Sequence, residues 1–201
     1  MSMGGLPQQK WLQAALYAGL LLLFAVAVAV GMTTPMPEDE LALEQARIYI
    51  GNYLETLPAA RISGFKETLS DVLLNGLLLL LLALGGTHIL GAPLILTVLF
   101  IKGMSVGYGA AFLLLYPGLS GGGLILLATL PPNLLLLPAL LRGSAVALGL
   151  STALLRRRHL PGFAWHRYLL IYAKLMLIIV AAALLHGYLT PWLLRLAFIA
   201  T

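Results

Sequence analysis

The fold is decided by two apolar stretches, Val72–Leu90 (VLLNGLLLLLLALGGTHIL) and Leu94–Tyr116 (LILTVLFIKGMSVGYGAAFLLLY), which are separated by Gly91-Ala92-Pro93. A helix needs about 20 apolar residues to cross roughly 30 Å of hydrocarbon, and both stretches are long enough. Glycine and proline together are typical of a tight turn. The segment therefore predicts two membrane-spanning helices joined as a hairpin.

Three further apolar runs bring the expected number of spans to about five. They are Trp11–Gly31, Leu134–Leu155 and Tyr168–Leu185. The first run resembles a signal peptide, because alanine alternates at positions 25, 27 and 29. Its apolar core exceeds the usual 7–15 residues of a signal, so we interpret it as an uncleaved span.

The composition agrees with a protein that lies almost wholly in a bilayer. Hydrophobic residues make up 61% of the chain and charged residues only 9%, whereas an average soluble domain is about a quarter charged. We expect one all-α, polytopic membrane domain over residues 1–201. Nothing in the sequence has the clustered basic face of a nucleic-acid-binding domain.

The stretch Leu124–Leu155 is too long for one ordinary span and too short for two. It contains Pro131-Pro132-Asn133, and two adjacent prolines remove two backbone donors and clash with the preceding turn. We predict a short half-buried helix, a break at these three residues, and a full span from Leu134. Asn133 would bond the freed carbonyls or a neighbouring helix; a ligand role is the alternative.

All seven acidic residues lie between Glu38 and Asp71, and we expect one polar loop over residues 32–71. Within it, apolar residues recur at helical spacing and form one stripe. The stripe would lie on the bilayer or on the protein itself, or else dock a partner. Its candidate docking residues are Leu43, Ile50, Tyr53 and Leu57.

The short loop 156–167 is rich in arginine, and such loops stay in the cytoplasm. We therefore predict a cytoplasmic N-terminus, with residues 32–71 and the C-terminus outside the cell. The tail 186–201 is too short to span and is expected at the interface.

Three basic residues, Lys102, Arg142 and Lys174, fall within the apolar runs. Charges inside a membrane are costly and point to function by default. Lys102 and Lys174 can instead snorkel toward the cytoplasmic edge. Arg142 lies deeper, and we expect it to face the interior of the protein. No carboxylate is expected within the membrane to pair with any of them.

Gly103 and Gly107 form a GxxxG seam, which allows close approach of two helices. Packing within the chain is the favoured interpretation, and a homo-oligomer interface is the alternative. Asn75 is expected to make an interhelical hydrogen bond.

The sequence contains few candidate catalytic groups. Cysteine is absent, the four histidines are scattered, and no nucleophile has a base beside it. There is no phosphate-binding loop or dinucleotide fingerprint. We therefore expect no enzyme, no metal and no cofactor.

Two motifs carry a resemblance over essentially the whole chain. Both resemble signatures of the stage II sporulation protein M family. The first is Phe100-Ile101-Lys102-Gly103 followed by Gly107, and the second is Leu130-Pro131-Pro132-Asn133-Leu134 followed by Pro138-Ala139-Leu140. Pro132 replaces the glutamine usual before Asn133, and Arg142 stands where a small or apolar residue is usual.

The resemblance implies a multi-pass protein of the bacterial cell membrane, surrounded by lipid. It further implies a scaffold of the engulfment machinery that holds the cell-wall hydrolases named stage II sporulation proteins D and P. The alternative from the residues is a transporter or channel for a small or anionic solute, because interrupted helices and unpaired intramembrane cations mark such proteins.

Overall fold

The computed structural model describes residues 5–34, 41, 44–45, 48, 64–114, 121–155 and 165–193. The long helices are α1 (Gly5–Thr33), α3 (Gly64–Gly86), α4 (Gly91–Leu114), α5 (Gly121–Leu155) and α6 (Trp165–Leu184). A π-helical turn, η1 (Leu185–Leu189), extends α6. Among these residues, five helices are long and apolar enough to cross a membrane. The expected all-α, multi-pass architecture is confirmed.

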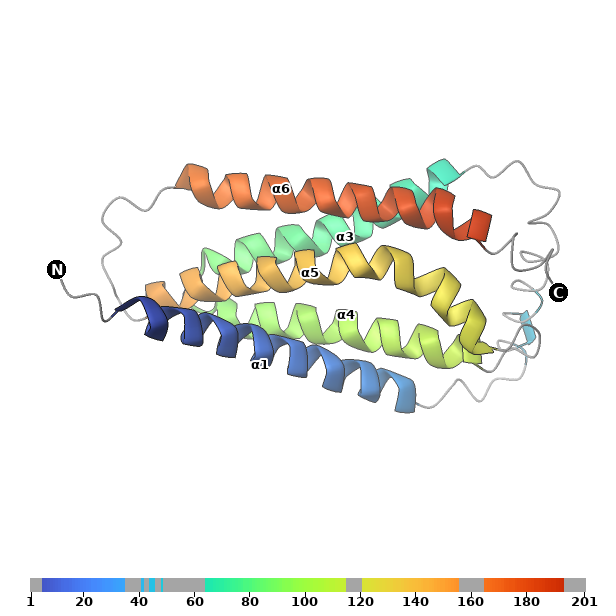
Figure 1. Ribbon diagram of the computed structural model, residues 1–201, viewed down its shortest axis with the longest axis horizontal. Helices are drawn as coiled ribbons and strands as arrows, with labels where there is room; N and C mark the ends of the chain where they lie inside the picture. Colours follow the sequence, from blue (N-terminus) through green and yellow to red (C-terminus); the bar gives the residue numbers. More distant parts are fainter. Residues whose placement is uncertain are drawn as a thin grey trace.

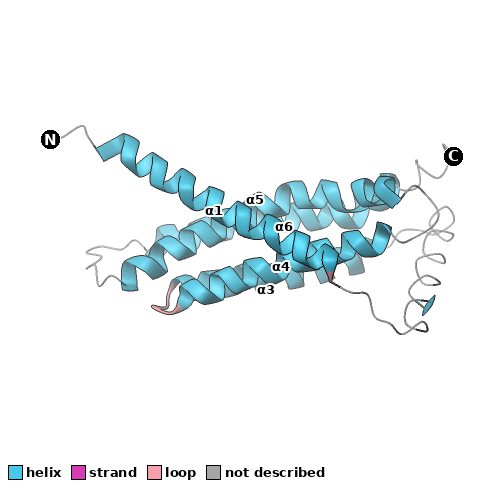
Figure 2. Ribbon diagram, turned by 90° about the horizontal axis from the view of Figure 1, so that it is seen from below, coloured by secondary structure: helices cyan, strands magenta, loops and turns pink. Residues whose placement is uncertain are grey.

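The helices form an elongated bundle with α5 at its centre (Figure 1). Helix α5 contacts α3, α4 and α6 along its length and touches α1 more lightly. Helix α1 packs chiefly on α4 and makes no contact with the described part of α6. Viewed from below, the first half of α1 diverges from the other helices (Figure 2).

The described helix ends fall into two groups at the two ends of the bundle (Figure 1). One end carries the start of α1, the α3–α4 turn, the end of α5 and the start of α6. The opposite end carries the end of α1, the starts of α3 and α5, and the ends of α4 and η1. The end of α1, the start of α3 and the end of the last helix therefore lie at the same end of the bundle, as five crossings require.

Glycines set the contact between α1 and α4. A Cβ on Gly107 would lie 2.0 Å from the carbonyl oxygen of Val28, and a Cβ on Gly103 would lie 2.6 Å from the Cβ of Ala27. A Cβ on Gly31 of α1 would meet Met104 at 2.2 Å. The expected packing of the Gly103–Gly107 seam within the chain is confirmed, and α1 covers this face of α4.

The outward face of the bundle is apolar, as lipid contact requires. On α3, large exposed side chains recur at intervals of three or four residues: Leu73, Leu77, Leu80 and Leu84. The opposite side of α3 is buried against α5 and α6. This arrangement suits a bilayer, which solvates apolar side chains.

The predicted break at Pro131-Pro132 is wrong. Helix α5 runs without interruption from Gly121 to Leu155 and contains Pro131, Pro132 and Pro138. It curves in its first, yellow part (Figure 1). A proline inside a helix costs one hydrogen bond and a steric clash, and bending the helix relieves the clash without ending it.

Three predicted boundaries also change. Helix α3 begins at Gly64 rather than at Val72, so Glu67 and Asp71 belong to a span and not to the polar loop. The interhelical turn lies at 87–90, and Gly91-Ala92-Pro93 opens α4. Proline is tolerated there because the first turn of a helix has no intrahelical partners for its N–H groups. The last span continues to Leu193, past the expected end at Leu185.

Candidate functional site

Polar residues of α3 line up on one face of that helix. Gly64, Thr68, Asp71 and Asn75 are spaced four, three and four residues apart, which places them on one side of a helix. Gly64 and Asn75 are buried, and Thr68 and Asp71 are half-buried. The same face continues inward with Leu79 and Leu82 of the core.

Two glycines bring this face against the end of α6. A Cβ on Gly64 would lie 2.3 Å from the carbonyl oxygen of Gly187, and a Cβ on Gly187 would lie 2.2 Å from Oγ1 of Thr68. The Thr68 hydroxyl donates to the carbonyl of Ala183 at 3.4 Å. Gly187 lies within the π-helical turn η1, and single π turns often occur at functional sites.

The crossing joins an acid to a histidine at membrane depth. The Asp71 carboxylate pairs with Nδ1 of His186, and both residues belong to spans. The expectation that the membrane would hold no carboxylate is therefore wrong. His186, expected in the interfacial tail, belongs to the last span, and its side chain is 41% exposed.

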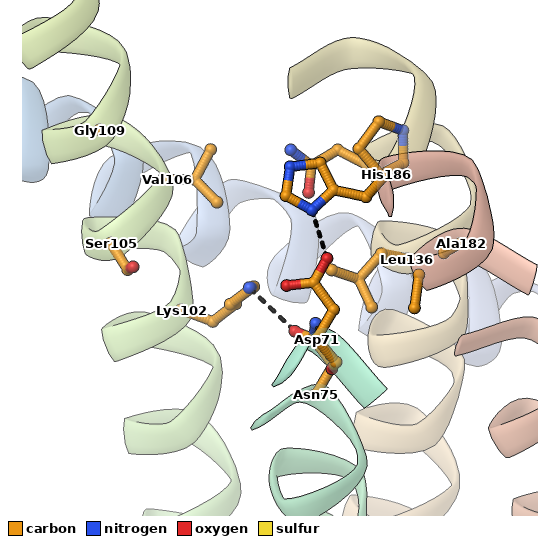
Figure 3. A pocket seen from close by; sticks show the side chains of 12 residues that line it. Asp71, Asn75, Lys102, Ser105, Val106, Gly109, Leu136, Ala182 and His186 are labelled. Atoms are coloured by element: carbon orange, nitrogen blue, oxygen red, sulfur yellow. Dashed lines mark hydrogen bonds and ion pairs between the residues drawn. The ribbon is translucent and has the colours of Figure 1, made fainter. Parts of the chain in front are cut away.

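A second pair connects α3 to α4. Nζ of Lys102 donates to Oδ1 of Asn75 at 3.0 Å, and Nδ2 of Asn75 donates to the backbone carbonyl of Asp71 at 3.0 Å. Figure 3 shows Asp71 between the His186 ring and the Asn75–Lys102 pair. We call Asp71, Asn75, Lys102 and His186 the polar cluster; it ties together α3, α4 and the end of α6.

The polar cluster lines a cavity of about 200 Å³. Helix α5 contributes Pro132, Asn133 and Leu136, and α4 adds Ser105, Val106 and Gly109. The remaining wall is Ala182 and Ala183 of α6. The space is large enough for several water molecules or a small polar molecule.

The electrostatics of the polar cluster are close to balanced. One carboxylate and one ammonium lie on facing helices, and an imidazole bonds the carboxylate directly. Burying such charges is costly unless each is paired and hydrogen-bonded. Because each member has a partner, the cluster stabilises one arrangement of the three helices. Among the described residues, no three potential metal ligands gather in one place.

The structure brings three predicted site residues together: Lys102, Pro132 and Asn133 line the cavity, and Pro131 lies beside it, half-buried. The snorkelling interpretation of Lys102 is wrong, because its ammonium bonds Asn75 inside the bundle. The interhelical hydrogen bond expected for Asn75 is confirmed. Gly103 and Gly107 lie against α1.

Arg142 and Lys174 lie apart from the cavity, and both are exposed. The predicted inward position of Arg142 is wrong. Its neighbours Gly143, Ser144 and Ala145 fill the buried side of α5 at this level, so the helical phase places position 142 on the exterior. The candidate docking residues Leu43, Ile50, Tyr53 and Leu57 lie outside the described residues.

Sequence reasoning missed Asp71 and His186 as site residues. A signal for Asp71 was present, because the spacing of Gly64, Thr68, Asp71 and Asn75 is that of a helix face. The span was instead taken to begin at the first purely apolar residue. No comparable signal linked Asp71 to His186, which is 115 residues away.

Comparison with protein families gives one match that covers most of the chain. Residues 20–191 match the family described as stage II sporulation protein M. No curated protein and no solved structure matches the chain.

Proposed function

Because the chain belongs to the stage II sporulation protein M family, we propose that it is a non-enzymatic membrane scaffold that anchors and positions extracytoplasmic peptidoglycan-remodelling proteins. Family membership associates the chain with sporulation, and five apolar helices make it a multi-pass membrane protein. The scaffold role and the identity of what it holds are the proposal.

The observation that carries the proposal is the pairing within the polar cluster. The carboxylate bonds the imidazole and the ammonium bonds the amide, so the intramembrane polar groups of the cluster satisfy one another. A catalytic site needs a nucleophile or base positioned beside a place for substrate. The cluster instead has the form of a clamp, which holds α3, α4 and α6 in one arrangement and gives a partner a rigid surface.

The proposed orientation follows from the arginine-rich loop 156–167, which belongs in the cytoplasm. The segment 35–63 then emerges on the cell-wall side, where hydrolases of peptidoglycan act. On this proposal the partners are the stage II sporulation proteins D and P, or wall hydrolases in their place. They would engage the apolar stripe that includes Ile50 and Tyr53.

A second candidate function, binding or transport of a small or anionic solute, is favoured by the cavity. It combines a half-buried lysine, two asparagines and a histidine at membrane depth, and polar cavities between helices are where transporters bind substrate. The two candidates differ in what the loss of Lys102 does. It weakens the clamp in a scaffold, and it abolishes flux in a transporter.

The deciding experiment compares partner retention with solute flux for the same purified protein. The double variant Ile50→Ser, Tyr53→Ser is expected to insert normally and to lose the co-purifying wall hydrolase. The matched control, Leu73→Ser and Leu77→Ser on the lipid-facing side of α3, is expected to keep it. In liposomes, neither the parent chain nor Lys102→Met should transport solute.

Two results would overturn the scaffold. One is saturable flux in liposomes that Lys102→Met abolishes, which would establish transport. The other is retention of the hydrolase by a variant that lacks residues 38–57. That variant has no docking segment, so the hydrolase would have to be held in another way. Intact insertion of each variant is checked by gel filtration in detergent and by protease protection of the loops.

A further inference from the structure

Two cations lie on the exterior of the bundle at the same depth. Arg142 of α5 and Lys174 of α6 are both exposed. The Tyr172 hydroxyl donates to the carbonyl of Gly143 at 2.8 Å, so positions 142 and 174 lie within one or two residues of the same crossing. Within the described part of the chain neither side chain has a hydrogen bond or ion pair.

Arg142 lies deep in the membrane. The Ser151 hydroxyl donates to the carbonyl of His88 at 2.9 Å, which places Ser151 level with the α3–α4 turn. Nine residues separate Arg142 from Ser151, and at 1.5 Å per residue this is about 14 Å along the helix axis. Since half the hydrocarbon thickness is about 15 Å, Arg142 is near the bilayer centre when the turn lies at the boundary.

The two side chains lean in opposite directions. Side chains on a helix tilt toward its N-terminus, and α5 and α6 are antiparallel (Figure 1). Lys174 therefore leans toward the nearer end of the bundle, where Trp165 and Arg167 open α6. Arg142 leans away from that end and toward the membrane centre. The guanidinium of Arg142 therefore lies farther from the headgroups than the ammonium of Lys174.

The surface around Arg142 is an exposed side of α5, which we call the Arg142 face. Helix α5 contacts both α1 and α6, and these two helices do not contact each other within the described chain. Pro138, Arg142 and Gly149 are exposed at intervals of four and seven residues and share this side of α5. A Cβ added to Gly149 would meet no atom within 4 Å. The Arg142 face is therefore open at Gly149 and charged at Arg142.

We infer that the Arg142 face of α5 binds a transmembrane helix of a partner protein that carries an aspartate or glutamate near the middle of its span. An unpaired arginine in hydrocarbon is costly, and a carboxylate at the same depth relieves the cost for both proteins. A small residue such as Gly149 lets a second helix approach closely. This inference rests on the proposed scaffold function, because it names the chemistry by which one partner is held.

The test uses the absence of cysteine from the chain. Single cysteines, introduced by Gly149→Cys on the Arg142 face and by Leu80→Cys on the lipid-facing side of α3, are labelled with a fluorophore. Each full-length protein is reconstituted in phosphatidylcholine vesicles. The probe is a leucine–alanine transmembrane peptide that carries a quencher and one central glutamate, and the matched peptide carries glutamine instead.

We expect the glutamate peptide to quench the Gly149→Cys label with about tenfold higher affinity than the glutamine peptide, which corresponds to about 1.4 kcal/mol. Arg142→Gln should remove this preference, and Arg142→Lys should restore part of it. Lys174→Gln removes the same charge at the same depth and should leave the preference in place. The Leu80→Cys label should report no difference between the peptides.

Equal affinity of the two peptides for the parent chain would overturn the inference, as would a preference that survives Arg142→Gln in a folded variant. Phosphatidylglycerol that co-purifies with the parent but not with Arg142→Gln, and that displaces the peptide, would assign the Arg142 face to lipid. Quenching of the label by a second copy of the chain would assign it to self-association. Both of these results overturn the inference.

The outcomes distinguish helix binding at the Arg142 face from the scaffold function. If the parent chain binds both peptides equally and still retains the wall hydrolase, helix binding at the Arg142 face alone is rejected. A clear preference for the glutamate peptide, with no hydrolase retained by the parent chain, rejects the scaffold alone.

Discussion

The substitution Gly107→Ala tests whether α1 is held by backbone contact with α4. A Cβ at this position would lie 2.0 Å from the carbonyl oxygen of Val28 and 2.8 Å from its carbonyl carbon. Both atoms belong to the backbone of α1, so no side-chain rotation can relieve the overlap. Helix α1 must move away, which weakens the burial of Leu20 and Phe24 against the bundle.

The expected magnitude combines two opposing terms. Overpacking costs about 1–3 kcal/mol, and a clash with backbone belongs at the upper end of that range. Replacing glycine by alanine inside a helix stabilises the helix by about 1 kcal/mol, because alanine has the higher helix propensity. We therefore expect Gly107→Ala to lower the free energy of unfolding by about 2 kcal/mol.

Gly109 is the matched control on the same helix. A Cβ there would meet no atom within 4 Å, so Gly109→Ala should gain about 0.5–1 kcal/mol from propensity alone. Gly103→Ala should fall between the two, because its nearest neighbour at 2.6 Å is the Cβ of Ala27. The three variants therefore form a graded series.

The assay is reversible unfolding of the purified protein in mixed micelles, followed by tryptophan fluorescence. We expect Gly107→Ala and Gly109→Ala to differ by about 3 kcal/mol. A difference below about 1 kcal/mol would refute the argument, because the variants would then share only the propensity effect. Equal secondary structure by circular dichroism would show that both proteins remain helical.

Three other predictions concern the polar cluster, the bend and the topology. In a double-mutant cycle with Asn75→Leu and Lys102→Met, unfolding measurements should give a coupling free energy of about 1 kcal/mol; additive effects would show that the two side chains do not stabilise each other. Pro132→Ala should reduce the curvature of α5, so spin labels at Gly121 and Leu155 should move apart; an unchanged distance would locate the cause of the bend elsewhere. A periplasmic-type reporter fused at residue 50 should be active and a cytoplasmic-type reporter inactive, and the reverse pattern would contradict the proposed orientation.

The sequence alone was sufficient for the class of fold. Runs such as Val72–Leu90 and Leu94–Tyr116 leave the chain no soluble alternative, because their backbone polar groups must be satisfied within a helix in lipid. The Gly103–Gly107 spacing likewise predicted a close helix contact within the chain. These features are local, since they depend on the length and period of a single segment.

Boundaries were predicted less well, because apolarity alone does not mark the end of a helix. Asp71 was assigned to the polar loop, although α3 begins seven residues earlier at Gly64. Pro131-Pro132 was expected to break a helix that in fact bends and continues. Helix α5 packs against α3, α4 and α6, and neighbouring helices allow a membrane helix to contain prolines that would break it in isolation.

The tertiary structure alone decided which polar residues meet and which face outward. Asp71 and His186 are 115 residues apart, and only the crossing of α3 and η1 at Gly64 and Gly187 brings them together. Arg142 and Lys102 are both cations within apolar runs, yet one is exposed and the other bonds Asn75 inside the bundle. The rotation of a helix about its own axis is set by packing against its neighbours, and when nearly all its residues are apolar its own sequence carries little of that information.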